Sequence, residues 1–168
     1  MGRVTGVGVR AADERDAAWI AEGVARAWGS TRVARLGELL DATTLPALVA
    51  ELGDERVGHL TYAVRGDACE VVTLLVAVRR RGVGRALVAG CAELAAAAGC
   101  RRLWLVTTND NVTAFAFYQR IGMDLRALHR DDVTRLRRLK PEIPLLGDAG
   151  VPLRHCLEFE LTLTPQPR

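Results

Sequence analysis

The sequence has little lysine, few aromatic residues and no long apolar run. Of its 23 basic side chains only Lys140 is a lysine, and aromatic residues make up 5% of the chain. No basic tract is interleaved with aromatic residues that stack on bases, so we expect no nucleic-acid partner. The first residues lack the apolar stretch of a signal peptide, and no apolar run approaches transmembrane length. We therefore expect a cytoplasmic protein without a membrane partner.

Paired cysteines are missing as well. The four cysteines are widely spaced, with no CxxC pair and no flanking histidines at metal-ligand spacing. They are Cys69, Cys91, Cys100 and Cys156. We expect no metal site, and we interpret the cysteines as small core residues in a reducing compartment.

What the chain does have is apolar content, 49% of 168 residues, which is enough for the core of one domain. Residues 4–9 are apolar enough for a first strand. Asp13 is a suitable N-cap for a helix that would run to Gly29. Over residues 30–44 the apolar positions favour a second short helix, through Val33, Leu36, Leu39 and Leu40.

The rest of the chain alternates strand and helix patterns. Three strand-like runs separated by turn residues predict an antiparallel meander. After them, apolar residues recur on one helical face until Gly99. The predicted elements are strands at 46–52, 57–64 and 69–78, a helix at 83–98, a strand at 102–108, a helix at 112–121, a strand at 123–129, a helix at 131–139 and a strand at 157–163. This order predicts one mixed α/β sheet, with parallel pairing through right-handed crossovers in the second half.

A glycine-rich turn follows the strand at 69–78. Its six residues from Arg79 to Gly84, RRRGVG, open the helix at 83–98. Amide groups at a helix N-terminus attract anions, glycines allow a phosphate to come close, and arginines add positive charge. The spacing fits neither a Walker loop nor the dinucleotide fingerprint. The turn therefore indicates a phosphate or pyrophosphate site, although an ordinary tight turn with solvated arginines explains the hexapeptide equally well.

Two motifs together resemble the GNAT N-acetyltransferase family. The turn matches the family pattern Gln/Arg-x-x-Gly-x-Gly/Ala through Arg79, Gly82 and Gly84. The segment from Asn111 to Met123 looks like the family's N-x-x-A-x-x-F-Y-x-x-x-G-F/M, with every quoted position filled. The resemblance covers residues 69–129. It implies a GNAT-like mixed central sheet of about seven strands with about four helices in a single domain.

The resemblance also implies which residues would hold acetyl-CoA. The amides from Arg80 to Arg85 would bind the pyrophosphate, Asn111 would contact the pantetheine arm, and the strand end near Val76 would pair with pantetheine as an added strand. The implied cofactor-binding residues are Leu75, Val76, Ala77, Arg79, Arg80, Arg81, Gly82, Val83, Gly84, Arg85, Asn111 and Tyr118.

Two side chains are candidate catalytic groups. By resemblance, Tyr118 would lie beside the thioester sulfur and protonate the departing thiolate; the alternative is a core aromatic. The attacking amine needs a base, for which Glu70 is the candidate; the alternative is a cross-strand partner for an arginine. Further residues that could line the acceptor side are His59, Tyr62, His155, Glu158 and Glu160.

The chain departs from the family pattern in two places. Residues 74–78 run directly into Arg79, where many relatives have a longer turn, so the register of the acyl-contacting strand stays open. The connection over residues 130–154 is long, and we expect it to border the acceptor site, since loops on a rigid scaffold carry specificity. The alternative for its charged residues is a solvated surface segment.

The implied function is transfer of an acetyl group from acetyl-CoA to a primary amine of a small molecule, by direct attack in a ternary complex. One alternative is acetylation of a protein N-terminus or lysine. Another is a regulatory module that binds acyl-CoA without turnover, although Tyr118 argues for catalysis. The sequence leaves open the acceptor, the acyl chain and whether the protein forms a homodimer.

Overall fold

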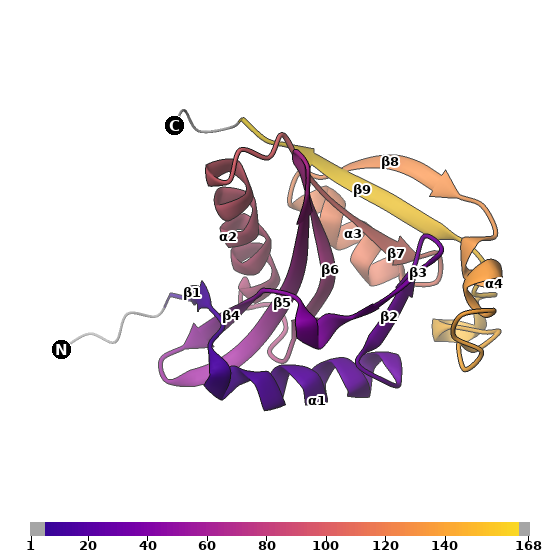
Figure 1. Ribbon diagram of the computed structural model, residues 1–168, viewed down its shortest axis with the longest axis horizontal. Coiled ribbons are helices and arrows are strands. Elements are labelled where there is room, and N and C mark those ends of the chain that lie inside the picture. Colours follow the sequence, from indigo (N-terminus) through magenta and orange to yellow (C-terminus); the bar gives the residue numbers. More distant parts are fainter. Residues whose placement is uncertain (1–5, 165–168) are drawn as a thin grey trace.

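One mixed sheet of seven strands runs through the computed structural model, which describes residues 6–164, and helices cover both faces of the sheet (Figure 1). The strands are β1 (Gly8–Ala11), β2 (Arg32–Arg35), β3 (Glu38–Asp41), β4 (Ala47–Leu52), β5 (Glu55–Arg65), β6 (Ala68–Val76), β7 (Arg102–Thr108), β8 (Asp124–His129) and β9 (Cys156–Thr162). The helices are α1 (Ala17–Trp28), α2 (Val83–Ala97), α3 (Val112–Arg120) and α4 (Asp132–Leu136). The order in the sheet is β1-β4-β5-β6-β7-β9-β8, and β2 and β3 form a separate hairpin. The predicted architecture is confirmed.

The predicted N-terminal strand and helix are both present, with shifted bounds. β1 begins at Gly8, and residues 4 and 5 of the predicted strand lie outside the described residues. The side chain of Asp13 accepts a hydrogen bond from the amide of Arg15 (2.9 Å) and caps a short 3₁₀ turn that leads into α1. Gly29, with φ of 78°, ends α1 in the left-handed conformation.

The helix predicted over residues 30–44 is wrong, because this segment forms the antiparallel hairpin of β2 and β3. Leu36 and Gly37, with φ of 43° and 77°, make the left-handed pair of a tight two-residue turn. Val33 and Arg35 are the buried positions of β2, so the period is two. A search for alternating hydrophobic residues does not detect this strand, because one of its two buried residues is an arginine.

The predicted meander is confirmed: β4, β5 and β6 pair in sequence and antiparallel. The third strand is shorter than expected, because β6 ends at Val76 and the chain then bends through residues 77–82 into α2.

Parallel pairing is confirmed for only one of the two predicted units. β6 and β7 are parallel neighbours joined by α2. β8 does not pair with β7, because β9 lies between them and is antiparallel to both. β9 therefore lies beside β7, in the position that the order of strands and helices along the sequence predicted for β8.

The sheet opens in its middle, between β6 and β7. Ala68–Glu70 pairs with Arg102–Trp104, and the ladder between the two strands stops there although both strands continue. β5 still pairs with β6 on one side, and β9 with β7 on the other. The two halves of the sheet thus diverge like a V (Figure 1).

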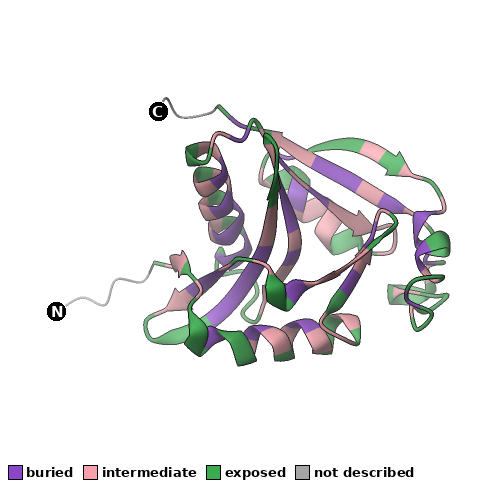
Figure 2. Cartoon of the chain, viewed as in Figure 1, coloured by how far each residue is buried: buried purple, intermediate pink, exposed green. Residues whose placement is uncertain are grey.

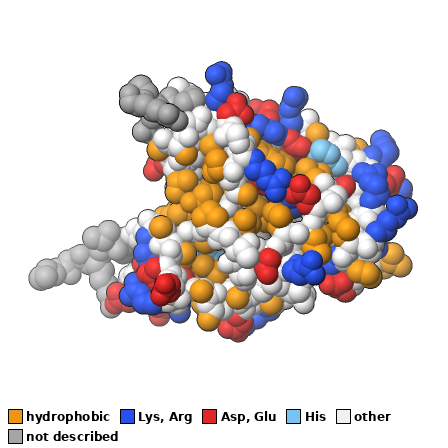
Figure 3. All heavy atoms as spheres, viewed as in Figure 1, with side chains coloured by type: hydrophobic (Ala, Val, Ile, Leu, Met, Phe, Trp, Pro, Cys, Tyr) orange, Lys and Arg blue, Asp and Glu red, His pale blue; other side chains and the backbone are white. Residues whose placement is uncertain are grey.

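Buried side chains form clusters on opposite faces of the sheet. On β4, Leu48 and Ala50 belong to the cluster that includes α2 and α3, whereas Val49 belongs to the cluster with α1. Figure 2 shows buried residues on the sheet and on the inner sides of these helices. On the face drawn in Figure 3, hydrophobic side chains gather over the centre, and charged side chains lie both beside them and at the margins. All four cysteines are free and buried, as expected of small core residues.

The long segment between β8 and β9 packs against the hairpin. It contains α4, which covers the middle of the helix predicted at 131–139. Val133 and Leu136 of α4 form a small buried cluster against which Ala34 and Leu36 of the hairpin pack. The backbone amide of Leu36 also donates to the carboxylate of Asp132 (3.1 Å).

Lys140 ties the same segment to α1. Its buried ammonium group donates to the carbonyls of Trp28 and Arg32, each at 2.6 Å. Through Lys140, the segment therefore links the end of α1 to the start of the hairpin. Among residues 6–164, no helix combines the length and apolar character needed to cross a membrane.

Candidate active site

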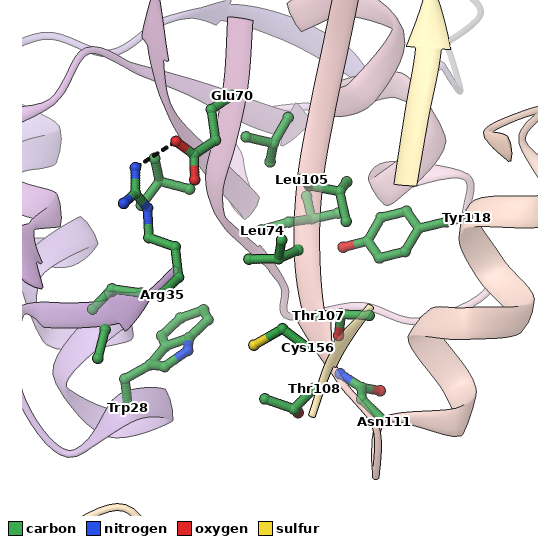
Figure 4. Close-up of a pocket in the computed structure, with 15 residues that line it drawn as sticks. Trp28, Arg35, Glu70, Leu74, Leu105, Thr107, Thr108, Asn111, Tyr118 and Cys156 are labelled. Atoms are coloured by element: carbon green, nitrogen blue, oxygen red, sulfur yellow. Dashed lines mark hydrogen bonds and ion pairs between the residues drawn. The ribbon is translucent and has the colours of Figure 1, made fainter. Parts of the chain in front are cut away.

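A cavity of about 160 Å³ lies where β6 and β7 diverge (Figure 4). Residues from the two sides of the opening line it. From the hairpin and β6 come Arg35, Glu70 and Leu74, among others; from β7 and beyond come Leu105, Thr107, Asn111 and Tyr118. Three of the residues singled out from the sequence, Glu70, Asn111 and Tyr118, are therefore brought together.

Tyr118 reaches the cavity from α3, and its hydroxyl group points across the opening in Figure 4. The ring is 8% exposed and packs against Phe117 and Phe159, with ring centroids 5.2 and 5.5 Å away. Burial raises the pKa of Tyr118 to about 12. The phenol is therefore protonated at neutral pH and available as a proton donor.

Glu70 lies on the other wall, 2% exposed, and forms an ion pair with Arg35 of the hairpin. Arg35 Nη2 donates to Glu70 Oε2 at 2.5 Å, and the residues are 35 positions apart. Burial raises the pKa of Glu70, and the hydrogen bond from Arg35 opposes that rise. The other oxygen, Oε1, has no hydrogen-bond partner among the residues that the structure describes. Glu70 thus pairs with an arginine, as the alternative interpretation expected, and it also lines the cavity; its role as a base stays a prediction.

Asn111 stands at the start of α3, exposed at the rim of the cavity. Its side-chain oxygen accepts a hydrogen bond from the amide of Ala114 (3.0 Å) and so caps the helix. The structure therefore gives Asn111 a structural role next to the cavity. The pantetheine contact stays a prediction.

The glycine-rich turn presents free backbone amides, as an anion site requires. The first helical hydrogen bond of α2 runs from the amide of Ala86 to the carbonyl of Gly82 (2.9 Å), so the amides of Val83, Gly84 and Arg85 precede it. Within residues 6–164 no side chain caps this end of α2, and Arg79, Arg80 and Arg81 around it are exposed. This arrangement fits a phosphate or pyrophosphate group.

The two glycines of the turn are needed for reasons other than room for a phosphate. Gly82 has φ of 76°, in the left-handed region. A Cβ on Gly84 would lie 3.0 Å from Cζ of Phe117 and 3.5 Å from a side-chain carbon of Val76. Gly84 therefore allows α2 to pack closely against α3 and the end of β6.

The predicted acyl-contacting strand end lines a second, mainly apolar cavity of about 280 Å³. Leu75, Val76 and Ala77 form one side of it, and Trp19 and His59 lie on the others. His59 is 2% exposed, and burial lowers its pKa to about 4. Its Nδ1 atom has no hydrogen-bond partner within residues 6–164.

The other acceptor-side candidates do not line the cavity between β6 and β7. His155 Nδ1 accepts a hydrogen bond from the amide of Asp131 (2.8 Å). Glu158 and Glu160 both bind Arg102, and Glu158 also bonds to His129. The side chains of His155, Glu158 and Glu160 therefore already have hydrogen-bond or ion-pair partners among the described residues.

The long segment over residues 130–154 also contributes no lining residue to the cavity. Its effect on the cavity is indirect, because it packs against the hairpin that carries Arg35. Its place on the acceptor side stays a prediction.

The sequence pattern missed Arg35 and Trp28, which both line the cavity. The available signal was Gly37 between two short runs, which marks a turn, although leucine is an unusual first residue for a two-residue hairpin turn. It would have placed Arg35 on an inward position of a strand, but not opposite Glu70. For metals, residues 6–164 contain no group of three or more His, Cys, Asp or Glu side chains that could hold an ion.

Comparison with known proteins finds relatives in sequence. A sequence model described as "Acetyltransferase (GNAT) family" matches residues 13–123. The uncharacterized protein YdhI of Bacillus subtilis is 39% identical over 137 residues, which cover 80% of this chain and 85% of that protein. The uncharacterized protein YxbD of the same organism is 36% identical over 129 residues, covering 76% and 80%.

Solved structures share the fold at lower identity. An IAA acetyltransferase from Bacillus cereus has a TM-score of 0.68 and 19% identity, covering 94% of this chain and 100% of that one. A Bacillus subtilis acetyltransferase in complex with CoA has a TM-score of 0.65 and 17% identity, covering 94% and 98%. A GNAT family acetyltransferase from Elizabethkingia anophelis with acetyl-CoA bound has a TM-score of 0.68 and 12% identity, covering 94% and 99%.

Proposed function

The chain belongs to the GNAT acetyltransferase family, and from this premise we propose that it moves an acetyl group from acetyl-CoA to a primary amine of a small molecule. The observation that carries the proposal is the cavity between β6 and β7, into which a protonated phenol and a buried carboxylate face from opposite walls. The attacking amine must lose a proton, and the departing thiolate must gain one. Tyr118 and Glu70 are groups suited to these two transfers.

Acetyl-CoA would lie along the opening of the sheet. The amides of Val83, Gly84 and Arg85, with the arginines before them, would bind the pyrophosphate. Pantetheine would run beside Leu75, Val76 and Ala77, on the edge of β6 that β7 leaves unpaired, and would pass Asn111. Two structures with the same fold contain CoA or acetyl-CoA, which supports this co-substrate.

The acetyl transfer would take place in a ternary complex of the protein, acetyl-CoA and the amine. The amine nitrogen forms a bond to the thioester carbonyl carbon, and the bond from that carbon to sulfur breaks. The hydroxyl group of Tyr118 gives its proton to the thiolate, and the amine proton goes to Glu70, directly or through water. The products are the N-acetylated acceptor and the free thiol of CoA.

The cellular setting also belongs to the proposal. Four free, buried cysteines are consistent with a reducing compartment, which supports a cytoplasmic location. Assembly into a homodimer is a further prediction, which sedimentation would test.

The proposal is tested by binding and turnover. Acetyl-CoA should raise the melting temperature, and a panel of primary amines should give thiol release that Tyr118→Phe lowers at least about tenfold, because the phenol supplies a general acid. Phe115→Leu is a matched control, since it alters an aromatic residue of the same helix that does not line the cavity. Unchanged turnover in Tyr118→Phe would remove Tyr118 from this role.

The same measurements separate the alternatives. Stabilisation by acetyl-CoA without turnover on any small amine, peptide or protein would favour a binding module. Turnover on peptide N-termini or lysines alone would favour a protein acetyltransferase. No stabilisation by any acyl-CoA would contradict the use of this co-substrate.

A further inference from the structure

The Arg35–Glu70 pair carries two unused hydrogen-bonding atoms. Arg35 Nη1 donates to Glu38 Oε2 at 2.6 Å, and Nη2 donates to Glu70 Oε2. Arg35 Nε and Glu70 Oε1 are both buried, and neither has a partner among residues 6–164. Leaving a buried polar group unpaired costs free energy, because the group loses its hydrogen bonds to water, so such atoms are rare unless a ligand or water meets them. Here one unused donor and one unused acceptor occur in a single ion pair.

Both residues line the cavity between β6 and β7. Arg35 is 5% exposed and Glu70 2% exposed. In Figure 4 they form the wall that faces Tyr118 across the cavity. Since Nε and Nη2 belong to one guanidinium group, and Oε1 and Oε2 to one carboxylate, a direct bond between Nη2 and Oε2 keeps the two unused atoms near each other. A ligand that satisfies both carries a donor and an acceptor a short distance apart, as on two adjoining carbons.

The charge of this wall decides which groups it accepts. Arg35 faces Glu70 and Glu38, and Arg65 donates to both oxygens of Glu38 (3.1 Å each). The hydrogen bonds from Arg65 and Arg35 hold the pKa of Glu38 at about 2, so its carboxylate is charged at neutral pH. Two arginines and two glutamates sum to zero. No surplus positive charge is left to bind a carboxylate, and a carboxylate here would be close to Glu70.

We propose that the acceptor is a primary amine with a neutral oxygen, hydroxyl or carbonyl, on the adjoining carbon. The amine lies at Glu70 Oε1, and the neighbouring oxygen accepts from Arg35 Nε. Arg35 is then a positioning residue that fixes the nitrogen beside its base. This assignment rests on the proposed acetyl transfer and adds the chemical class of the acceptor.

Four amines that share the unit CH3–CH(NH2)–C test the assignment. Alaninol carries a hydroxyl group next to the aminated carbon, alaninamide a neutral carbonyl, alanine a carboxylate, and sec-butylamine no oxygen. With acetyl-CoA saturating, kcat/KM for alaninol or alaninamide should exceed that for sec-butylamine and alanine at least about tenfold, as expected for a matched hydrogen bond. Preference for alaninol indicates a small amino alcohol, and preference for alaninamide indicates a peptide-like amine.

Arg35→Lys isolates the role of Nε. Lysine keeps the positive charge beside Glu70 and Glu38, but it has a methylene group where arginine has the Nε–H that would donate to the acceptor oxygen. The preference for the oxygen-bearing amine should fall at least about fivefold, mainly through KM, with a smaller change for sec-butylamine. Glu38→Gln removes the other carboxylate at Arg35 and lies outside the cavity, so it should keep the preference for alaninol over sec-butylamine, whereas the surplus positive charge that it leaves should improve the use of alanine.

The outcomes are distinguishable from failure of the proposed function. Absence of thiol release with every amine tested, although acetyl-CoA binds, contradicts acetyl transfer itself. Three results would overturn the assignment of the acceptor. The first is equal kcat/KM for sec-butylamine and alaninol, and the second is turnover only with amines that lack the neighbouring oxygen. The third is a folded Arg35→Lys variant that keeps the preference of the wild type.

Discussion

The two sides of the opening in the sheet are built by different means. On the side of α2, the groups predicted to bind a ligand are backbone amides and exposed arginines within residues 79–85. On the side of the hairpin, they are two buried side chains that lie 35 residues apart and depend on each other for charge balance. The first side depends on residues close together in the chain. The second holds only if the tertiary structure brings β2 against β6, and it is the side to which we assign the proposed specificity.

The largest expected effect lies on the buried side. Glu70→Gln keeps the shape and a hydrogen bond to Arg35 but removes the base, so kcat/KM at neutral pH should fall at least about 100-fold. In the wild type, log kcat/KM should decline as the pH falls through the pKa of Glu70, which burial places above the usual range of a glutamate. The variant should lose this acid limb. A pH–rate profile with a saturating acyl donor measures both quantities.

Glu38→Gln is the matched control for that comparison. Its carboxylate binds the same arginine but lies outside the cavity. If Glu70→Gln lowered kcat/KM no more than Glu38→Gln did, Glu70 would be a structural partner of Arg35 and the base would lie elsewhere.

A smaller effect is expected from His59, which is buried beside the predicted acyl-contacting strand end. Its folded-state pKa of about 4 lies below that of an exposed histidine, so the unfolded chain binds the proton first and stability falls as the pH drops. Between about pH 7.5 and about pH 5, this group alone should lower the free energy of unfolding by about 2 kcal/mol. Urea denaturation of the wild type and of His59→Gln measures the difference. The same slope with pH in both proteins would show that His59 is not buried as the neutral form.

The smallest expected effect concerns the packing beneath the glycine-rich turn. In Gly84→Ala the new Cβ meets the ring of Phe117, and this strain outweighs the gain in helix propensity, for a net loss of about 1 kcal/mol. In a Phe117→Leu background the contact is gone, so the same substitution should become neutral or stabilising. A double-mutant cycle of unfolding free energies measures this change of sign. An equal loss in both backgrounds would place the strain elsewhere.

The fold was predictable wherever short-range patterns decide it. The meander of β4 to β6, the helix α2 and the segment of α3 follow periodicities and turn residues that the structure confirms. The hairpin of β2 and β3 was missed because Arg35 occupies an inward position and hides the alternation. The place of β9 between β7 and β8 was missed because the order of elements along the chain does not specify which strands become neighbours.

For this protein, the sequence by itself determined the family, the glycine-rich turn at the start of α2 and the presence of Tyr118 in the second motif, since each depends on residues close together in the chain. The tertiary structure alone decided that Arg35 meets Glu70, that one buried atom of each has no hydrogen-bond partner among residues 6–164, and that Gly84 allows two helices to pack closely. The physical reason is that backbone amides and turns are specified locally, whereas burial and charge balance depend on which distant segments the fold places side by side.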